Sequence, residues 1–333
     1  MRSIDVHAHL VPQCLLSAVD SGGEWHGLRL EKGDGPGRLV GHGRNIPLAP
    51  APLRYTPEDR IKDMDQQGTD VQVISIHMPI VGYHLDTPDG LQLAKDVNDE
   101  ISYMTKQWPG RFAGLATLPV QDVDTSIAEL ERAVTELGLK GAALDTVVNS
   151  ANWDEEQFLP LFKAAEQLGA LLFYHPQPNN NLISQQVNDK YAFGNSIGVP
   201  LEDTLVVAAL IFGGVLEQCP DLKVCIAHGG GPACFGMGRM DHAWQVRSEA
   251  RINIQKPPST YLRRMYYDTV TNSEAVLRFL IDTVGSDRVV LGSDWPFVGW
   301  NPSPTGWVQA LESLTQEEKD KVLWQNLESL LGI

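Results

Sequence analysis

The chain has 333 residues, of which 43% are hydrophobic and 20% are charged, and its formal net charge is −16. This composition is ordinary for a globular enzyme, and the negative charge argues against nucleic acid and anionic membrane surfaces as partners. The four cysteines form no C-x-x-C pair. We therefore expect reduced thiols, no cysteine zinc site and a cytoplasmic protein. The N-terminus lacks a signal-peptide pattern, and no apolar run has the length of a membrane span.

Short apolar runs alternate along the chain with segments of helical periodicity. The apolar runs predict eight β-strands, at residues 3–8, 71–77, 112–119, 141–146, 170–176, 223–229, 265–270 and 288–294. The helical patterns include residues 56–68, 122–138, 154–169, 201–220 and 272–285. We expect Thr56 and Gly68 to cap the first of these helices, and Gly138 and Gly169 to end the next two.

Strict alternation of strands and helices predicts a parallel sheet, and eight such units predict a (β/α)₈ TIM barrel. A doubly wound open sheet is the alternative. We expect a single domain over residues 1–333. Residues 20–55, rich in Gly and Pro, and residues 177–200, which are polar, follow the first and fifth strands. Both are expected to be loop insertions on the catalytic face.

Polar side chains gather where the predicted strands end, which is the face that carries the active site of such a barrel. They are His7, His9, His77, His175, His228, Asp268 and Asp294. Alternate residues of a strand face the same way, so the first two histidines can converge on one metal ion, with Asp5 on the same face. Scattered structural histidines would not sort in this manner. The pattern therefore predicts a metal site.

His7, His9, His175 and Asp294 make a set of three nitrogen ligands and one oxygen ligand. Such a set suits Zn²⁺ best, with Mn²⁺, Fe²⁺ or Co²⁺ as alternatives. The fourth strand ends in "ALDT", which supplies no bridging ligand for a second ion, so we expect one metal. His228 is then free to act as an acid or base. The glycines of "AHGGG" (227–231) are expected to let the backbone approach a bound substrate.

Several motifs, in this order, resemble the amidohydrolase-2 family. They are "IDVHAHLVP", "RIKDMDQQGTDVQVIS", "FAGLATLPVQD", "YHP", "GGVLEQCPDLKVCIAHGGG" and "VVLGSDWPF". The nearest resemblance is to its non-oxidative aromatic acid decarboxylases, typified by α-amino-β-carboxymuconate-ε-semialdehyde decarboxylase. The resemblance implies a single amidohydrolase-like TIM barrel with one divalent metal. It also implies that His7, His9, His175 and Asp294 are the ligands and that His228 is catalytic.

The same resemblance bears on substrate binding. It implies a homodimer in which Arg239 and Arg247 reach the substrate carboxylate across the interface. A solvated helix face is the alternative for these two residues. An arginine in the loop after the first strand would also contact substrate, with Arg44 the better candidate and Arg54 the other. Gln177 stands where the semialdehyde decarboxylases have tryptophan, which favours a more polar ring as substrate.

The expected reaction is loss of CO₂ from a small anionic acid. Candidate substrates are a hydroxylated aromatic or pyridine carboxylate and a carboxymuconate-semialdehyde-like acid. Asp294 or His228 would deliver the proton to the ring carbon. The ring could be walled by Trp295, Phe297, Tyr83 or Phe193, although each of these also fits plain packing.

Two alternatives stay open. One is a metal-dependent hydrolase of an amide or lactone, or a hydratase of an unsaturated diacid, because the same ligand set could activate water. The other is a barrel that holds its metal only for folding. Structural zinc sites are usually closed and rich in cysteine, which argues against the second alternative. The sequence assigns no role to His77.

Overall fold

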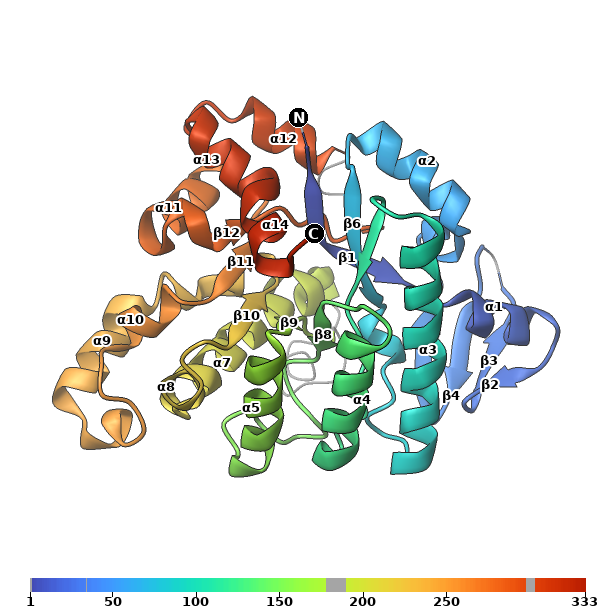
Figure 1. The fold of residues 1–333 in the computed structure, drawn as a ribbon, viewed down its shortest axis with the longest axis horizontal. Helices are drawn as coiled ribbons and strands as arrows, with labels where there is room; N and C mark the ends of the chain where they lie inside the picture. The colour runs from blue at the N-terminus through green and yellow to red at the C-terminus, as the bar shows by residue number, and fades with distance from the viewer. Residues whose placement is uncertain (1, 34, 178–189, 298–302) are drawn as a thin grey trace.

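A computed structural model describes residues 2–33, 35–177, 190–297 and 303–333. Eight parallel strands form its centre (Figure 1). They are β1 (Ile4–Leu10), β6 (Val71–Ile76), β7 (Phe112–Gly114), β8 (Gly141–Leu144), β9 (Leu171–Tyr174), β10 (Lys223–Ile226), β11 (Tyr266–Asp268) and β12 (Val289–Val290). Each lies within a predicted strand except at the end of β1, which runs two residues further than expected. These strands are buried almost throughout, which explains their continuous apolar runs.

The eight strands close into a barrel. Regular pairing gives one sheet of order β1-β6-β7 and another of order β12-β11-β10-β9-β8. Backbone hydrogen bonds join the two sheets at both seams. At one seam the Ala116 amide donates to the Gly141 carbonyl at 2.8 Å, and at the other the Val6 amide donates to the Leu291 carbonyl at 2.9 Å. The (β/α)₈ TIM barrel is therefore confirmed, and the alternative of an open doubly wound sheet was wrong.

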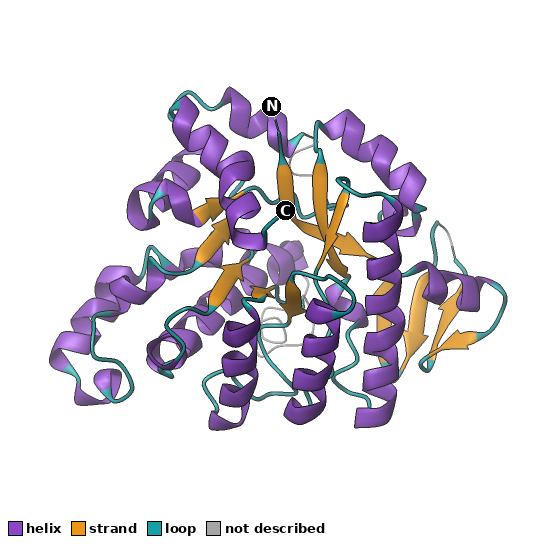
Figure 2. Ribbon diagram, in the orientation of Figure 1, coloured by secondary structure: helices purple, strands orange, loops and turns teal. Residues whose placement is uncertain are grey.

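Helices cover the outside of this barrel (Figure 2). In chain order they are α1 (Gln13–Asp20), α2 (Pro57–Gln67), α3 (Thr87–Gln107), α4 (Val123–Thr135), α5 (Leu159–Leu168), α7 (Val199–Phe212), α8 (Val215–Gln218), α9 (Met237–Val246), α10 (Pro258–Leu262), α11 (Glu274–Val284), α12 (Pro304–Ala310), α13 (Gln316–Asp320) and α14 (Asn326–Leu331). The buried faces of α4, α5 and α11 carry the apolar residues that the helical periodicity indicated, whereas α3 was not among the predicted helices.

Most of the expected helix ends are confirmed by their caps. The Thr56 hydroxyl accepts a hydrogen bond from the Asp59 amide, and Gly68 closes α2 with φ of 74°. Gly169 closes α5 in the same left-handed conformation, with φ of 62°. The expected role of Gly138 was wrong, because α4 ends at Thr135 and its C-cap is Glu136. Gly138 has φ of 79° but lies two residues beyond that cap, in the turn towards β8.

The insertion after the first strand is a small sheet rather than the loop that we expected. Its four antiparallel strands are β2 (Glu24–Trp25), β3 (Leu28–Glu31), β4 (Arg38–Gly41) and β5 (Arg44–Pro47). The sheet lies beside α1 and α3, at the right of Figure 1. Its strands are short and separated by glycine-rich turns, which hid their alternation of apolar and polar residues. It places Arg44 at the start of β5.

Only part of the insertion after the fifth strand can be compared with the expectation of a loop, because residues 178–189 lie outside the described residues. Residues 190–198 form short helical turns that lead into α7. Residues 194–212 together are long and apolar enough to span a membrane by composition. We interpret this stretch as a barrel helix. Val206, Val207 and Leu210 are buried in the core, and Asp203 bonds His228.

Candidate metal centre and active site

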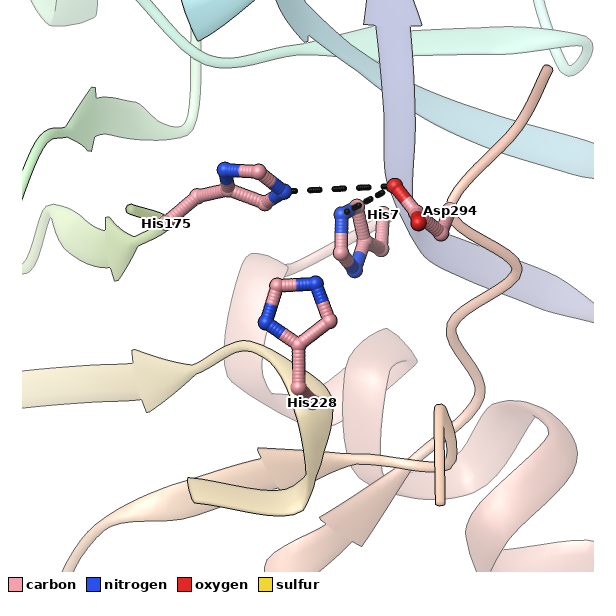
Figure 3. Close-up of side chains that lie close together, drawn as sticks. All are labelled: His7, His175, His228 and Asp294. Carbon is pink, nitrogen blue, oxygen red and sulfur yellow. Dashed lines mark ion pairs between the residues drawn. The ribbon is translucent and has the colours of Figure 1, made fainter. Parts of the chain in front are cut away.

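Three histidines from two distant parts of the chain surround one carboxylate oxygen. Asp294 Oδ1 lies 3.1 Å from His7 Nε2, 2.9 Å from His9 Nε2 and 3.9 Å from His175 Nε2. His7 and His9 point inward from β1, whereas His175 follows β9 and Asp294 follows β12. Figure 3 shows His7, His175 and Asp294 directed towards a common point. The structure thus brings together all four expected ligands.

The spacing of these atoms fits a bound metal ion. Ligand atoms bound at about 2.1 Å in tetrahedral geometry lie about 3.4 Å apart, and the separations from Asp294 Oδ1 bracket that value. Among the described residues, His7 Nε2 and both ring nitrogens of His175 are buried without a hydrogen-bond partner. Buried polar nitrogens without partners are costly in a folded protein, and coordination to a cation would satisfy them.

The protonation states of His9, His175 and Asp294 also fit a metal ligand set. Burial lowers the pKa of His9 well below its usual value and lowers that of His175 to about 4, so both are neutral. Burial opposes ionisation of Asp294. The charge of His7 and the close approach of the surrounding imidazoles outweigh burial and hold the pKa of Asp294 well below its usual value. Neutral imidazoles and an ionised carboxylate are the forms that coordinate metals.

His7 is held by a second carboxylate, for which the sequence analysis predicted no role. Its Nδ1 lies 2.6 Å from Asp268 Oδ2, and both side chains are fully buried. Asp268 Oδ1 accepts the backbone amides of Gly229 and Val270, so its orientation is fixed. A carboxylate behind a ligating histidine orients the ring and raises its basicity. Asp268 therefore serves to aim His7 Nε2 at the cluster.

His228 adjoins the cluster and has its own carboxylate partner. Its Nδ1 lies 2.9 Å from Asp203 Oδ2, in α7. Its ring centroid is 4.9 Å from that of His175, and Figure 3 shows the ring pointing towards the cluster. Burial lowers the pKa of His228, but the charge and hydrogen bond of Asp203 outweigh burial and raise it. His228 is thus suited to hold a proton near neutral pH.

The glycines after β10 have close neighbours within the protein. Their expected approach to substrate stays a prediction. Gly230 packs against the ring of Tyr267, and a Cβ on Gly231 would lie 2.0 Å from the Pro200 carbonyl oxygen. The glycines therefore let this turn approach β11 and α7, although Gly229 and Gly231 also line a cavity beside His228. This close approach brings His228 within reach of Asp203.

One cavity borders the cluster, and a second lies behind His77 and Phe297, whose rings contact His9. One, of about 660 Å³, is mostly apolar and includes His228 and Asp294 in its lining. The other, of about 440 Å³, is lined by Arg44, His77 and Gln177 and by apolar residues including Phe297. Burial lowers the pKa of His77 to about 3, so its imidazole is neutral, and its ring lies 5.5 Å from that of His9. The second cavity therefore combines a cation, neutral polar groups and an aromatic wall.

The structure separates the expected substrate-binding residues. Arg44 lines the second cavity, whereas both bonds from Arg54 Nη2 go to Asp20 at 2.6 and 2.8 Å, in an exposed ion pair. Phe297 lines the same cavity as Arg44.

The other three candidates for the ring wall have different surroundings. Trp295 is buried with the Arg60 guanidinium 4.0 Å from its ring centroid. Tyr83 is buried and its hydroxyl accepts the Asp145 amide. Phe193 is 41% exposed before α7. These contacts match the packing alternative for Trp295 and Tyr83.

Arg239 and Arg247 do not line either cavity of their own chain. Arg239 is exposed on α9, and Arg247 pairs loosely with Glu249 at 3.7 Å. α9 ends at Val246, so the two arginines do not share one continuous helix. Any contact of these two arginines with substrate would therefore be in the site of another chain.

The chain belongs to the amidohydrolase family: the family model Amidohydro_2, described as amidohydrolase, matches residues 4–333. The chain is similar to 2-amino-3-carboxymuconate-6-semialdehyde decarboxylase of Dictyostelium discoideum. The two are 33% identical over 280 residues, which cover 84% of this chain and 77% of that protein. Gamma-resorcylate decarboxylase of Polaromonas sp. is 27% identical over 288 residues, covering 82% of this chain and 86% of that one.

Solved structures show the same fold. The 5-carboxyvanillate decarboxylase of Sphingomonas paucimobilis superposes with a TM-score of 0.85 at 26% identity, and the match covers 100% of this chain and 99% of that chain. A dihydroxybenzoic acid decarboxylase from Polaromonas sp., solved with bound manganese and the inhibitor 2-nitroresorcinol, has a TM-score of 0.81 at 22% identity and covers 99% and 97%. The chain is an enzyme of this family, and these relatives are carboxy-lyases.

Sequence reasoning missed two carboxylates near the site, Asp203 and Asp145, and predicted no role for a third, Asp268. Asp268 is the last residue of β11, and Asp203 lies on the buried side of the apolar helix α7. A carboxylate in the buried stretch of a helix is rare unless it is paired, and that rarity was the available signal for Asp203. Asp145 directly follows β8, in the segment "ALDT" that supplies no bridging ligand for a second ion.

Proposed function

We propose that the chain is a metal-dependent, non-oxidative decarboxylase of a hydroxylated aromatic or heteroaromatic carboxylate, or of a carboxymuconate-semialdehyde-like acid. The buried cluster of His7, His9, His175 and Asp294 beside the His228–Asp203 pair is the observation that carries this proposal. Membership in the amidohydrolase family and the named activities of the relatives support it. We place the enzyme in the cytoplasm.

One divalent ion would be held by His7, His9, His175 and Asp294. Zn²⁺ is our first choice for this set of borderline nitrogen and hard oxygen ligands, and Mn²⁺, Fe²⁺ and Co²⁺ suit it as well. When bound, the ion supplies positive charge that neutralises and orients an anionic substrate. The manganese in the Polaromonas structure belongs to that protein and makes Mn²⁺ the first alternative to test.

His228 is the proton donor in this proposal. Its Nε2 gives a proton to the ring carbon that bears the carboxylate, and Asp203 stabilises the charged imidazolium before transfer. An ortho hydroxyl lets the ring accept that proton. The bond from the ring carbon to the carboxylate then breaks, its electron pair restores the conjugated ring, and CO₂ leaves. Asp294 is a poor donor because its pKa lies well below its usual value.

The cavity that contains Arg44 and Phe297 is the proposed seat of the substrate's anionic end. Arg44 supplies the positive charge that offsets the net charge of the chain, and Phe297 offers a ring face. Gln177 and His77 make this wall more polar than a tryptophan would. The lining favours an oxygen-substituted ring over the semialdehyde.

Arg239 and Arg247 lead us to propose a homodimer. Each partner would extend α9 over the other barrel and add arginine to the substrate site. The support is that both arginines are exposed and that α9 has no buried residue in the single chain. Large apolar side chains beside them, including Phe235 and Ile252, are 84% and 75% exposed. Exposed apolar residues in such a group mark protein interaction sites.

The function is tested by a substrate screen with metal-replete protein. Hydroxylated benzoates and pyridine carboxylates are incubated with enzyme while ring absorbance and released CO₂ are followed. We expect at least one of them to release CO₂, and we expect His228→Ala to keep its metal and lose turnover. Absence of CO₂ from all of them, or wild-type kcat in His228→Ala, would contradict the proposal.

A hydrolase or hydratase is the second candidate function, because the same ligands could activate water. Reaction in H₂¹⁸O separates the two. A decarboxylase yields a product without ¹⁸O, whereas a hydrolase or hydratase incorporates it. Incorporation of ¹⁸O together with retention of the carboxylate would replace our proposal with this alternative.

The shared site is tested by mixing two inactive variants. His228→Ala lacks the proton donor, and Arg239→Ala lacks the arginine given to the partner. A heterodimer of the two would contain one site with both defects and one intact site. We expect activity to return after subunit exchange. Mixed protein that exchanges subunits but stays inactive would show that Arg239 acts within its own chain.

A further inference from the structure

We propose that Asp145 is a positioning residue that acts through Gln177 to fix the direction of Arg44 in the substrate cavity. This inference rests on the proposed function, in which Arg44 meets the anionic end of the substrate. Asp145 and Gln177 are 1% and 4% exposed, and Gln177 and Arg44 both line the cavity. The three residues come from the ends of β8 and β9 and from the inserted sheet.

The hydrogen bonds that link these three residues run in one direction. Arg44 Nη2 donates to Gln177 Oε1 at 3.2 Å, and Gln177 Nε2 donates to Asp145 Oδ2 at 2.8 Å. Arginine only donates and a carboxylate only accepts, so the two neighbours fix which end of the amide faces each of them. Gln177 is thus unable to turn over without losing both contacts. Its carbonyl oxygen is held towards Arg44.

Asp145 is itself fixed by its own loop. Its Oδ1 accepts the Thr146 amide at 2.7 Å and the Gln177 amide at 3.2 Å. Its backbone amide donates to the Tyr83 hydroxyl at 3.3 Å. Burial raises the pKa of Asp145 to about 7, and the hydrogen bonds from Thr146 and Gln177 act in the opposite direction. The carboxylate therefore predominates at pH 8, where the tests below are made.

Arg44 depends on its acceptors for its direction. Apart from the glutamine amide, its guanidinium bonds the carbonyls of Val81 and Pro79 and also His84 Nδ1, all in the segment that follows β6. Burial lowers the pKa of Arg44, and the charge of Asp145 acts against that effect. Asp145 and Arg44 thus form an ion pair bridged by one amide. Loss of the bridge would leave the guanidinium held only by the segment after β6.

The isosteric change Asp145→Asn tests this arrangement. The new amide side chain can keep one oxygen for the two backbone amides, but its NH₂ group would then face Gln177 and force that side chain to turn over. The turned amide presents its own NH₂ group to Arg44, and two donors repel. At pH 8 we expect KM to rise about tenfold while kcat stays within about twofold. If Asp145 served only to cap its own loop, Asp145→Asn would leave KM unchanged. That result would overturn the proposal.

Two comparisons sharpen the test. In an Arg44→Ala background, Asp145→Asn should raise KM no further, because the two residues act as one unit. An equal rise in that background would contradict the proposal. Glu129→Gln is the matched control. Glu129 is a buried carboxylate that bonds Asn98 and Arg132 and lies outside both cavities. The KM of this variant should therefore equal that of the wild type.

A crystal structure of Asp145→Asn tests positioning without any substrate. We expect the contact between Arg44 Nη2 and Gln177 to be lost, while the His7–Asp294 cluster is unchanged. An intact contact in the variant would overturn the proposal even if decarboxylation is confirmed. Failure of the substrate screen would instead remove the proposed function and leave this structural result to stand by itself.

Discussion

At the scale of single residues, the site depends on carboxylates that hold imidazoles. Asp294 stands among three histidines, Asp268 backs His7, and Asp203 backs His228. These different surroundings give the imidazoles different protonation states. His9 and His175 are kept neutral by burial, whereas the carboxylates keep a proton on His7 and His228 in the absence of metal.

Metal affinity is expected to rise with pH because His7 must lose its proton to bind an ion. Burial opposes that proton, but the charges of Asp294 and Asp268 outweigh burial and raise the pKa of His7 to about 10. Each ion bound near neutral pH should therefore release about one proton, and affinity should rise about tenfold per pH unit. Competition with a chelator at pH 6, 7 and 8 measures this. An affinity that does not change with pH would contradict the expected release.

Asp203→Asn should reduce kcat about 10- to 100-fold with metal content unchanged. The substitution removes the negative charge that raises the pKa of His228, so less of the imidazole carries a proton at pH 7. Steady-state kinetics and metal analysis of the same samples measure both quantities. Asp282→Asn, an exposed carboxylate on α11, is the control. Wild-type kcat in Asp203→Asn would remove Asp203 from the site.

At the scale of elements, the ends of strands position the site, and two of its residues need unusual backbone. His228 and Asp294 have φ of 52° and 59°, in the left-handed region that side chains rarely adopt. Strain of this kind is held in place by the surrounding structure and concentrates at functional sites. The turn after β10 is held by its packing on α7 and β11, and the segment after β12 by its bonds to β1.

Gly231→Ala tests the packing of that turn. A Cβ at this position would lie 2.0 Å from the Pro200 carbonyl oxygen, on a residue with φ of 54°. We expect the turn to move away from α7, lengthening the His228–Asp203 contact and lowering kcat about tenfold. The free energy of unfolding should fall by about 1–3 kcal/mol. Denaturant titration and kinetics measure the two effects, with Gly33→Ala, which meets no neighbour, as the control. Unchanged kcat would show that the turn tolerates a side chain.

The strands and the candidate ligands were predictable because periodicity and strand ends are local signals. The eight buried strands follow from short apolar runs, and the four candidate ligands stand in or directly after three of these runs. The partners of the other site residues were not predictable. Asp203 meets His228 only after α7 packs against the turn, and Gln177 meets Arg44 only after the small sheet folds over the barrel. Contacts of this kind depend on tertiary packing, which no local pattern records.

At the scale of the whole molecule, the two sides of the barrel differ. The inserted sheet covers one side and supplies Arg44, while α9 and α10 extend on the other (Figure 1). The second side carries the exposed Phe235, Val246 and Ile252, which are 84%, 60% and 75% exposed. A chain of net charge −16 must gather positive groups at its site to bind an anion. In the proposed homodimer, Arg239 on the partner's α9 and Arg247 directly after that helix would supply them.

Phe235→Asp should therefore weaken the dimer and raise KM together. A charge in the centre of an apolar contact is costly to bury, so sedimentation velocity should show mainly monomer at micromolar concentration. Tyr103→Asp, on α3 and 58% exposed, is the matched control and should leave the assembly unchanged. A wild-type chain that sediments as a monomer, or a Phe235→Asp variant that still sediments as a dimer, would contradict the proposed interface.

The central claim is that one ion binds where His7, His9, His175 and Asp294 converge. Anomalous diffraction from crystals of zinc-reconstituted protein, recorded on both sides of the zinc absorption edge, tests it most directly. The account predicts one zinc peak per chain, within coordination distance of these four side chains. A peak at another position, or no peak in fully reconstituted protein, would contradict it.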